Sequence, residues 1–82
     1  MSQVQTIIGM LETLGNELRM PYSKSLGGGL FELRIIGQKH IRIIYAFHNN
    51  GAVLLNIFMK KRWSIPRKEI EYARNILKLY VA

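Results

Sequence analysis

The chain has 82 residues, and compact domains usually contain about 100 to 200, so we expect residues 1–82 to form a single domain. A domain this small buries only about 60 to 65% of the surface that its unfolded chain exposes, so a partner that covers apolar area would stabilise it. The apolar content of 49% argues against a disordered tail. The absence of cysteine excludes a disulfide framework and any cysteine-ligated metal site.

The charge is strongly asymmetric along the chain. Twelve Lys and Arg residues against five Glu residues give a net charge of +7. Residues 1–31 hold two basic and two acidic residues, so the whole excess lies in residues 32–82. Such a field favours polyanions, meaning nucleic acid, an acidic protein or anionic lipid.

The chain is expected to be cytoplasmic. Its first ten residues, MSQVQTIIGM, lack the basic region that opens a secretory signal. The longest apolar run, residues 43–47, is far shorter than the roughly 18 residues that span a bilayer. We therefore expect neither export nor membrane insertion.

An amphipathic helix is predicted at the start of the chain, because apolar residues recur there at helical spacing. Ser2 is a suitable N-cap, and Gly15 is suited to a left-handed residue at the helix end. We expect a short turn of helix and then a loop containing Pro21 to follow Gly15. The apolar stripe consists of Val4, Ile7, Ile8, Leu11, Leu14 and Leu18.

Three strands are predicted next, at residues 30–36, 40–48 and 53–59. Alternation places eleven apolar or aromatic residues on one face. To keep them on one face each hairpin needs an odd-numbered loop, and three-residue loops at 37–39 and 49–51 satisfy this, the second ending in a glycine. We therefore expect an antiparallel meander with a single apolar face. That face consists of Phe31, Leu33, Ile35, Ile41, Ile43, Tyr45, Phe47, Val53, Leu55, Ile57 and Met59.

The opposite face is predicted to bring two arginines together. In this register Arg34 lies across from Arg42, and Arg42 lies across from Phe58. Like charges directly opposed in a sheet destabilise it, so stability alone does not account for the pair. Two interpretations remain: Glu32 and solvent relieve the repulsion, or the pair is kept because it binds an anion.

A closing helix is predicted with Pro66 as its first residue. Its apolar stripe consists of Ile70, Ala73, Ile76, Leu77 and Tyr80. The predicted fold class is therefore α+β, with an N-terminal helix, a three-stranded antiparallel meander and a C-terminal helix.

Familiar catalytic and metal-binding patterns are absent from the sequence, which has no Asp, no Cys and no phosphate-binding glycine fingerprint. Glycines 27–29 precede a strand, which favours a turn over a phosphate cradle. His40 and His48 lie near strand ends without a carboxylate cluster, which favours edge positions over metal ligation. We expect no metal and no cofactor.

A basic run follows the third predicted strand and surrounds Trp63. The run is either a solvated strand end or, together with Arg34 and Arg42, one groove that binds phosphate. Trp63 either stacks on a base or packs against the closing helix. Cleavage of RNA by its own 2′-OH needs orientation and charge stabilisation, which Arg and Lys can supply. The candidate RNA-binding residues are Lys60, Arg62, Trp63, Arg67 and Lys68, and the candidate catalytic residues are Arg42, Lys61 and Arg34.

The sequence resembles the RelE/ParE toxin superfamily, and within it the HigB-like, phage-derived branch. The resemblance covers about residues 11–80 and is carried by four segments: GLFELR from 29, IRIIYAF from 41, LLNIFMKK from 54 and IPRKEIEYA from 65. It implies a RelE-like fold without its usual first strand and a type II toxin that cuts mRNA on the ribosome. The implied partners are the ribosome, mRNA and a cognate helix-turn-helix antitoxin. The missing strand would expose a sheet edge, through which a homodimer can form.

The resemblance also implies roles for individual residues. Arg42 matches the arginine that stabilises the reacting phosphate, Arg34 matches a basic residue that contacts RNA, and Lys61 falls near the second phosphate-stabilising cation. Two positions depart from RelE itself: Glu32 stands where RelE has a lysine, and Arg67 falls roughly where RelE has its catalytic tyrosine.

Two other functions fit the same resemblance. A ParE-like toxin would bind DNA gyrase and perform no chemistry, and a truncated family member would be inactive. Arg42 and the basic residues 60–62 favour the RNA-cleaving toxin, because a pure binder needs no phosphate-stabilising cation.

Overall fold

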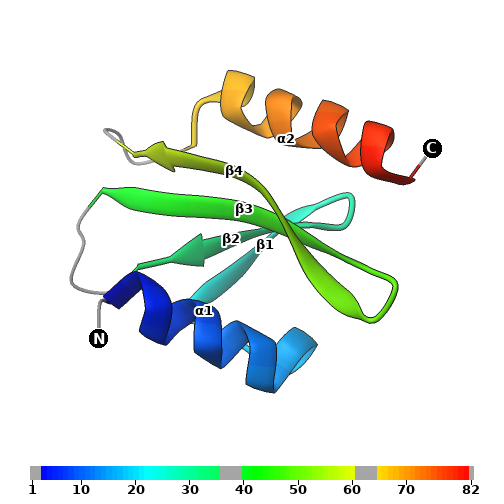
Figure 1. The fold of residues 1–82 in the computed structure, drawn as a ribbon. Helices are drawn as coiled ribbons and strands as arrows, with labels where there is room; N and C mark the ends of the chain where they lie inside the picture. The colour runs from blue at the N-terminus through cyan, green and yellow to red at the C-terminus, as the bar shows by residue number, and fades with distance from the viewer. Residues whose placement is uncertain (1–2, 36–39, 61–64, 82) are drawn as a thin grey trace.

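The fold consists of two helices and a four-stranded antiparallel sheet with strand order β1-β2-β3-β4 (Figure 1). The computed structural model describes residues 3–35, 40–60 and 65–81. The elements are α1 (Gln3–Leu14), a 3₁₀ turn (Gly15–Glu17), β1 (Ser23–Gly27), β2 (Leu30–Arg34), β3 (Ile41–His48), β4 (Gly51–Met59) and α2 (Arg67–Val81). The predicted α+β class is confirmed, whereas the prediction of three strands is wrong, because the described residues form four.

Helix α1 ends as predicted. Gly15 has a φ of 56°, a left-handed conformation that glycine adopts without steric cost. The chain then makes the single 3₁₀ turn Gly15–Glu17. The predicted N-cap, Ser2, lies outside the described residues.

Strand β1 occupies the segment that was predicted as loop. It pairs antiparallel with β2 through a two-residue turn, in which Gly28 and Gly29 have φ values of 61° and 83°. Positive φ at both positions is the geometry of a tight hairpin, so the prediction of a turn at the glycines is confirmed. The strand was missed because Ser23, Lys24 and Ser25 show no apolar alternation, and their pairing depends on β2.

The turn between β3 and β4 differs from the prediction. His48 pairs with Gly51, so the loop has two residues rather than three. Asn49 and Asn50 occupy it with φ values of 51° and 65°, which asparagine tolerates better than most residues.

A bulge in β4 offsets the shorter loop, so that the pairing of β3 with β4 beyond the bulge is the predicted one. Ile44 pairs with Asn56 and Tyr45 with Leu54, so Leu55 is the extra residue. Beyond the bulge, Ile57 lies opposite Ile43, as predicted. Val53 and Leu55 belong instead to the opposite face of the sheet, and their predicted placement is wrong.

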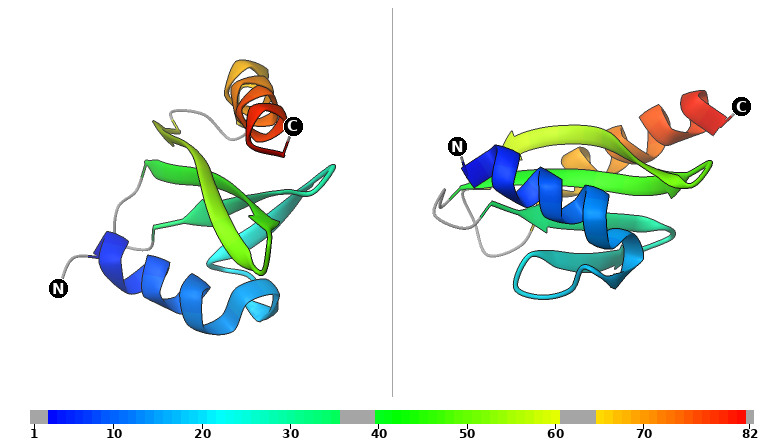
Figure 2. Two further views of the ribbon diagram at one scale, coloured as in Figure 1. Left: turned by 45° about the vertical axis from the view of Figure 1, so that its right-hand side comes forward. Right: turned by 60° about the horizontal axis from the view of Figure 1, so that its bottom comes forward.

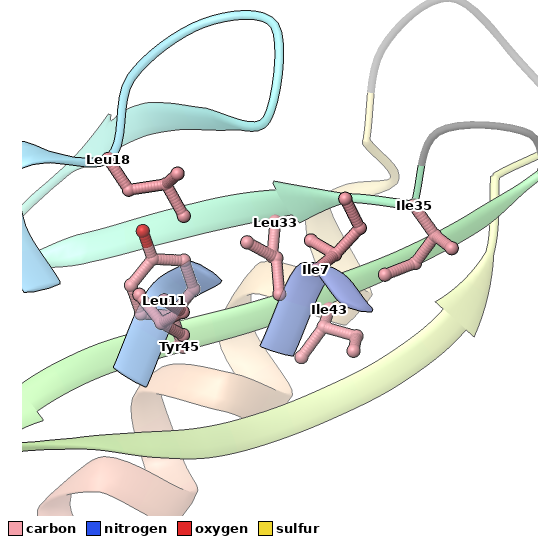
Figure 3. Close-up of a cluster of buried hydrophobic side chains, with 7 residues drawn as sticks. All are labelled: Ile7, Leu11, Leu18, Leu33, Ile35, Ile43 and Tyr45. Carbon is pink, nitrogen blue, oxygen red and sulfur yellow. The ribbon is translucent and has the colours of Figure 1, made fainter. Parts of the chain in front are cut away.

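Helix α1 covers one face of the sheet (Figure 2). Seven buried side chains form the core on that side, as Figure 3 shows; they come from α1 and the segment after it, from β2 and the residue after it, and from β3. On β4 the same face stays exposed, with Ile57 at 65% and Met59 at 61%. The core on this side consists of Ile7, Leu11, Leu18, Leu33, Ile35, Ile43 and Tyr45.

Helix α2 covers the other face, which contradicts the prediction of a single apolar face (Figure 2). The bulge adds Leu55 to the residues that α2 buries, and Ala73 of α2 is fully buried. Tyr80, predicted in the buried stripe, is 57% exposed and its ring lies against His48. The second core consists of Leu30, Ile44, Ala46, Leu55, Phe58 and Ala73, with Ile70, Ile76 and Leu77 packed against it.

Helix α2 begins at Arg67, one residue later than predicted. The carbonyl of Pro66 accepts a hydrogen bond from the backbone N–H of Glu69 at 3.0 Å, so proline directly precedes the first turn. Of the helices in the described ranges, neither has the length and hydrophobicity needed to cross a membrane.

Candidate nucleic-acid interface

The candidate site lies on the sheet face that α2 covers in part, at the end where β2 finishes and β3 begins. Arg34 and Arg42 are directly opposed across these strands, and Phe58 of β4 is opposed to Arg42. Both pairings are as predicted. Here the alternation of β2 and β3 is uninterrupted, since the bulge of β4 lies further along the strand.

The buried side chain of Glu32 forms ion pairs with both arginines. Its side chain is 1% exposed, with Oε1 at 3.3 Å from Nε of Arg34 and Oε2 at 3.5 Å from Nε of Arg42. Nζ of Lys60 lies 3.4 Å from the same Oε2. The interpretation that Glu32 relieves the repulsion between the arginines is therefore supported, because its negative charge lies within ion-pair distance of both guanidinium groups.

The cluster of Glu32, Arg34, Arg42 and Lys60 keeps an excess of positive charge, since three cations surround one anion. The side chains of Arg34, Arg42 and Lys60 are 25%, 17% and 13% exposed. In addition, Nη1 of Arg42 donates to the carbonyl of Ile41 at 2.8 Å. Such a partly open group of fixed cations can bind an anion, and guanidinium groups are well matched to phosphate.

A further cation joins this surface from the strand that was not predicted. Lys24 of β1 is exposed and pairs across the sheet with Glu32. The alternating strand geometry places both side chains on the same face. Lys24 was missed because its position depends on β1, although the glycine pair after β1 is itself a hairpin signal.

The start of α2 is anchored to β4 by a side chain that sequence reasoning overlooked. Nδ2 of Asn56 donates to the backbone carbonyl of Glu69 at 3.0 Å and to its Oε1 at 3.1 Å. Arg67 and Lys68 precede Glu69 in the first turn of α2 and are exposed. Within the part of the chain that the structure describes, neither Arg67 nor Lys68 forms an ion pair with Glu32. Lys61, Arg62 and Trp63 lie outside that part.

The two histidines lie at opposite ends of β3. His40 Nδ1 is 3.2 Å from the carbonyl oxygen of Lys60, and the ring of His48 packs edge-on against Tyr80 with the centroids 5.3 Å apart. The two rings therefore cannot share a ligand.

The side chain of Arg74 in α2 packs against the glycine turn between β1 and β2. A Cβ atom on Gly28 would lie 2.6 Å from Nη1 of Arg74, so the guanidinium group rests against the turn. Arg74 thereby connects α2 with the β1–β2 hairpin.

Comparison with protein families gives a match that spans nearly the whole chain. Residues 2–78 match the family described as Phage derived protein Gp49-like (DUF891). Comparison with curated proteins finds no significant match. The family match includes the arginine pair, Glu32, all of α1 and all but the last three residues of α2. The chain therefore belongs to the phage-derived Gp49-like family, a RelE-like toxin family whose members are often the toxins of toxin–antitoxin systems.

Proposed function

We propose that the chain is a type II toxin of the HigB-like branch and that it cleaves mRNA on the ribosome. The observation that carries the proposal is the pair of opposed arginines on a partly open sheet face, held by a buried carboxylate. The net charge of +7 adds a long-range attraction for ribosomal and messenger RNA.

The proposed chemistry is attack of the RNA 2′-OH on the adjacent phosphate. The 2′-oxygen forms a bond to phosphorus and gives a 2′,3′-cyclic phosphate, the bond from phosphorus to the 5′-oxygen breaks, and the proton lost by the 2′-OH is balanced by one gained by the leaving 5′-oxygen. The protein contributes in-line positioning and stabilisation of the negative charge that develops on the phosphate. Arg42 takes the charge-stabilising role, Lys61 supplies a second cation, and Arg34 contacts the RNA. We assign the remaining RNA contacts to Lys60, Arg62, Trp63, Arg67 and Lys68.

The proposal includes an antitoxin as partner and a cytoplasmic site of action. The edge strand β4 supports a protein partner, since Leu54, Ile57 and Met59 are 41%, 65% and 61% exposed and residues 51–59 carry no charge. An uncharged edge strand with exposed apolar side chains invites pairing with another chain. We propose that the antitoxin covers this edge and that a homodimer forms through it when the antitoxin is absent.

Induction in growing cells tests the proposed function. We expect protein synthesis to stop, ribosome-bound mRNA to be cut, and DNA synthesis to continue at first. Loss of DNA synthesis with intact mRNA would instead support gyrase binding, and unimpaired growth would support an inactive family member.

A further inference from the structure

Glu32 is the most deeply buried charged side chain among the described residues, with 1% exposure. It lies in the middle of β2, with Lys24 across from it on β1 and Ile44 across from it on β3. A buried carboxylate has a large desolvation cost unless cations and hydrogen-bond donors surround it. Its surroundings therefore indicate what Glu32 does.

Three strands contribute to those surroundings. Arg34 ends β2, Arg42 lies near the start of β3, and Lys60 follows β4 directly. Their nitrogen atoms lie 3.3 to 3.5 Å from the carboxylate oxygens of Glu32. One carboxylate thus links the cations of three consecutive strands.

The contacts also set the orientation of the guanidinium groups. Arg34 and Arg42 both face Glu32 with Nε. Because a guanidinium is planar and rigid, a contact at Nε restricts where the two terminal nitrogens point. For Arg42 the orientation is defined at a second point, since Nη1 donates to the carbonyl of Ile41.

We propose that Glu32 is a positioning residue, which orients Arg34 and Arg42 for the phosphate of the RNA to be cut. The inference rests on the proposed function and deepens it. At 1% exposure the carboxylate is shielded from RNA, so it acts through the arginines. Glu32 lowers the net positive charge that attracts RNA. It also holds the guanidinium groups of Arg34 and Arg42 side by side in a fixed orientation, although they repel each other.

Glu32→Gln tests the proposal because it keeps the size of the side chain and removes its charge. Misplaced catalytic groups cost up to about 100-fold in rate, so we expect single-turnover cleavage at saturating RNA to fall by about that factor. Binding of a labelled single-stranded mRNA oligonucleotide should be at least as tight as for the wild type, since the net charge rises by one. Parallel losses in binding and cleavage that follow the folded fraction in circular dichroism would overturn the proposal.

Glu69→Gln is the matched control. It makes the same change in charge, and its carboxylate contacts Asn56 rather than the arginines. We expect the same or tighter RNA binding and an unchanged cleavage rate. An equal loss of cleavage in both variants would attribute the effect to charge alone and would contradict the role of Glu32.

A second measurement reads the arginines directly. In ¹⁵N NMR spectra, the Nε–H signals of Arg34 and Arg42 should be sharp and slow to exchange in the wild type and in Glu69→Gln. They should broaden or exchange at least about tenfold faster in Glu32→Gln, because the carboxylate that forms an ion pair with both groups is gone. Unchanged signals would overturn the proposal. Ordered signals that depend on Glu32, in a chain that leaves ribosome-bound mRNA intact, would support the positioning and contradict the proposed function.

Discussion

Among individual side chains, Arg42 is expected to matter most for RNA cleavage. Arg42→Ala should lower the cleavage rate by about 10²- to 10³-fold, the usual loss for one preorganised electrostatic donor. The fold should persist, because Glu32 retains Arg34 and Lys60 as partners. Arg42→Lys should restore little activity, because lysine keeps the charge but loses the planar donor group. Wild-type cleavage by Arg42→Ala, with a native circular dichroism spectrum, would show that the assignment is wrong.

Ile43, the residue after Arg42, is expected to affect stability rather than cleavage. Its side chain is 0% exposed in the core beneath α1. Ile43→Ala should therefore lower the free energy of unfolding by about 2 to 5 kcal/mol, measured by urea titration, while cleavage per folded molecule stays near the wild-type value. A loss of cleavage greater than the loss of folded protein would mean that the α1 face also contributes to the site.

Tyr45 gives a pH-dependent prediction. Its hydroxyl is hydrogen-bonded to the Ser23 hydroxyl, and burial raises the pKa of Tyr45 above its ordinary value of 10.0, partly opposed by that hydrogen bond. The folded state therefore favours the neutral phenol. The contribution of Tyr45 to the free energy of unfolding is complete below about pH 10 and is lost as the pH rises through the pKa of the folded state.

Tyr45→Phe tests this linkage. The variant leaves the Ser23 hydroxyl without the Tyr45 hydroxyl as partner, so we expect a loss of about 1 to 3 kcal/mol at neutral pH. The difference in unfolding free energy between wild type and variant should shrink above pH 10, as followed by urea titration across pH. A difference that stays constant through that range would contradict the raised pKa.

Among the secondary-structure elements, the β3–β4 hairpin depends on two asparagines in left-handed conformation. Asn50→Ala should lower the unfolding free energy by about 1 to 2 kcal/mol, because a Cβ atom is strained there. Asn50→Gly should equal or exceed the wild type, since glycine adopts this conformation freely. Thermal unfolding of the pair measures the difference, and equal stability of the two variants would argue against the two-residue turn.

The apolar periodicity of the sequence could predict some secondary-structure elements and not others. Helix α1 and its end at Gly15 could be predicted because helix spacing and a left-handed glycine are local features. Strand β1 could not, since Ser23 and Lys24 carry no apolar pattern and form a strand only by pairing with β2. The β4 bulge was likewise missed, because an added residue is recognised only against the partner strand.

For the chain as a whole, RNA binding is expected to depend steeply on salt. If Z cations contact phosphates, the logarithm of the association constant should fall with a slope of about −0.7Z against the logarithm of salt concentration. The described candidates are Arg34, Arg42, Lys60 and the exposed Lys24, Arg67 and Lys68. Replacing Lys24 with Ala should reduce the slope by about 0.7. A flat titration would exclude the basic surface as the binding site.

The sequence by itself determined the α+β class, the location of both helices and the opposition of Arg34 and Arg42, because each follows from spacing within one or two adjacent elements. It left two interpretations of the arginine pair open: Glu32 and solvent relieve the repulsion, or the pair binds an anion. Only the tertiary structure decided that this carboxylate is buried and bound to cations from three strands. It also decided that both faces of the sheet are covered, since the bulge and the packing of α2 place Leu55 on the second face. Burial and ion pairing arise from contacts between segments that are distant in the sequence, so they cannot be predicted from a local sequence pattern.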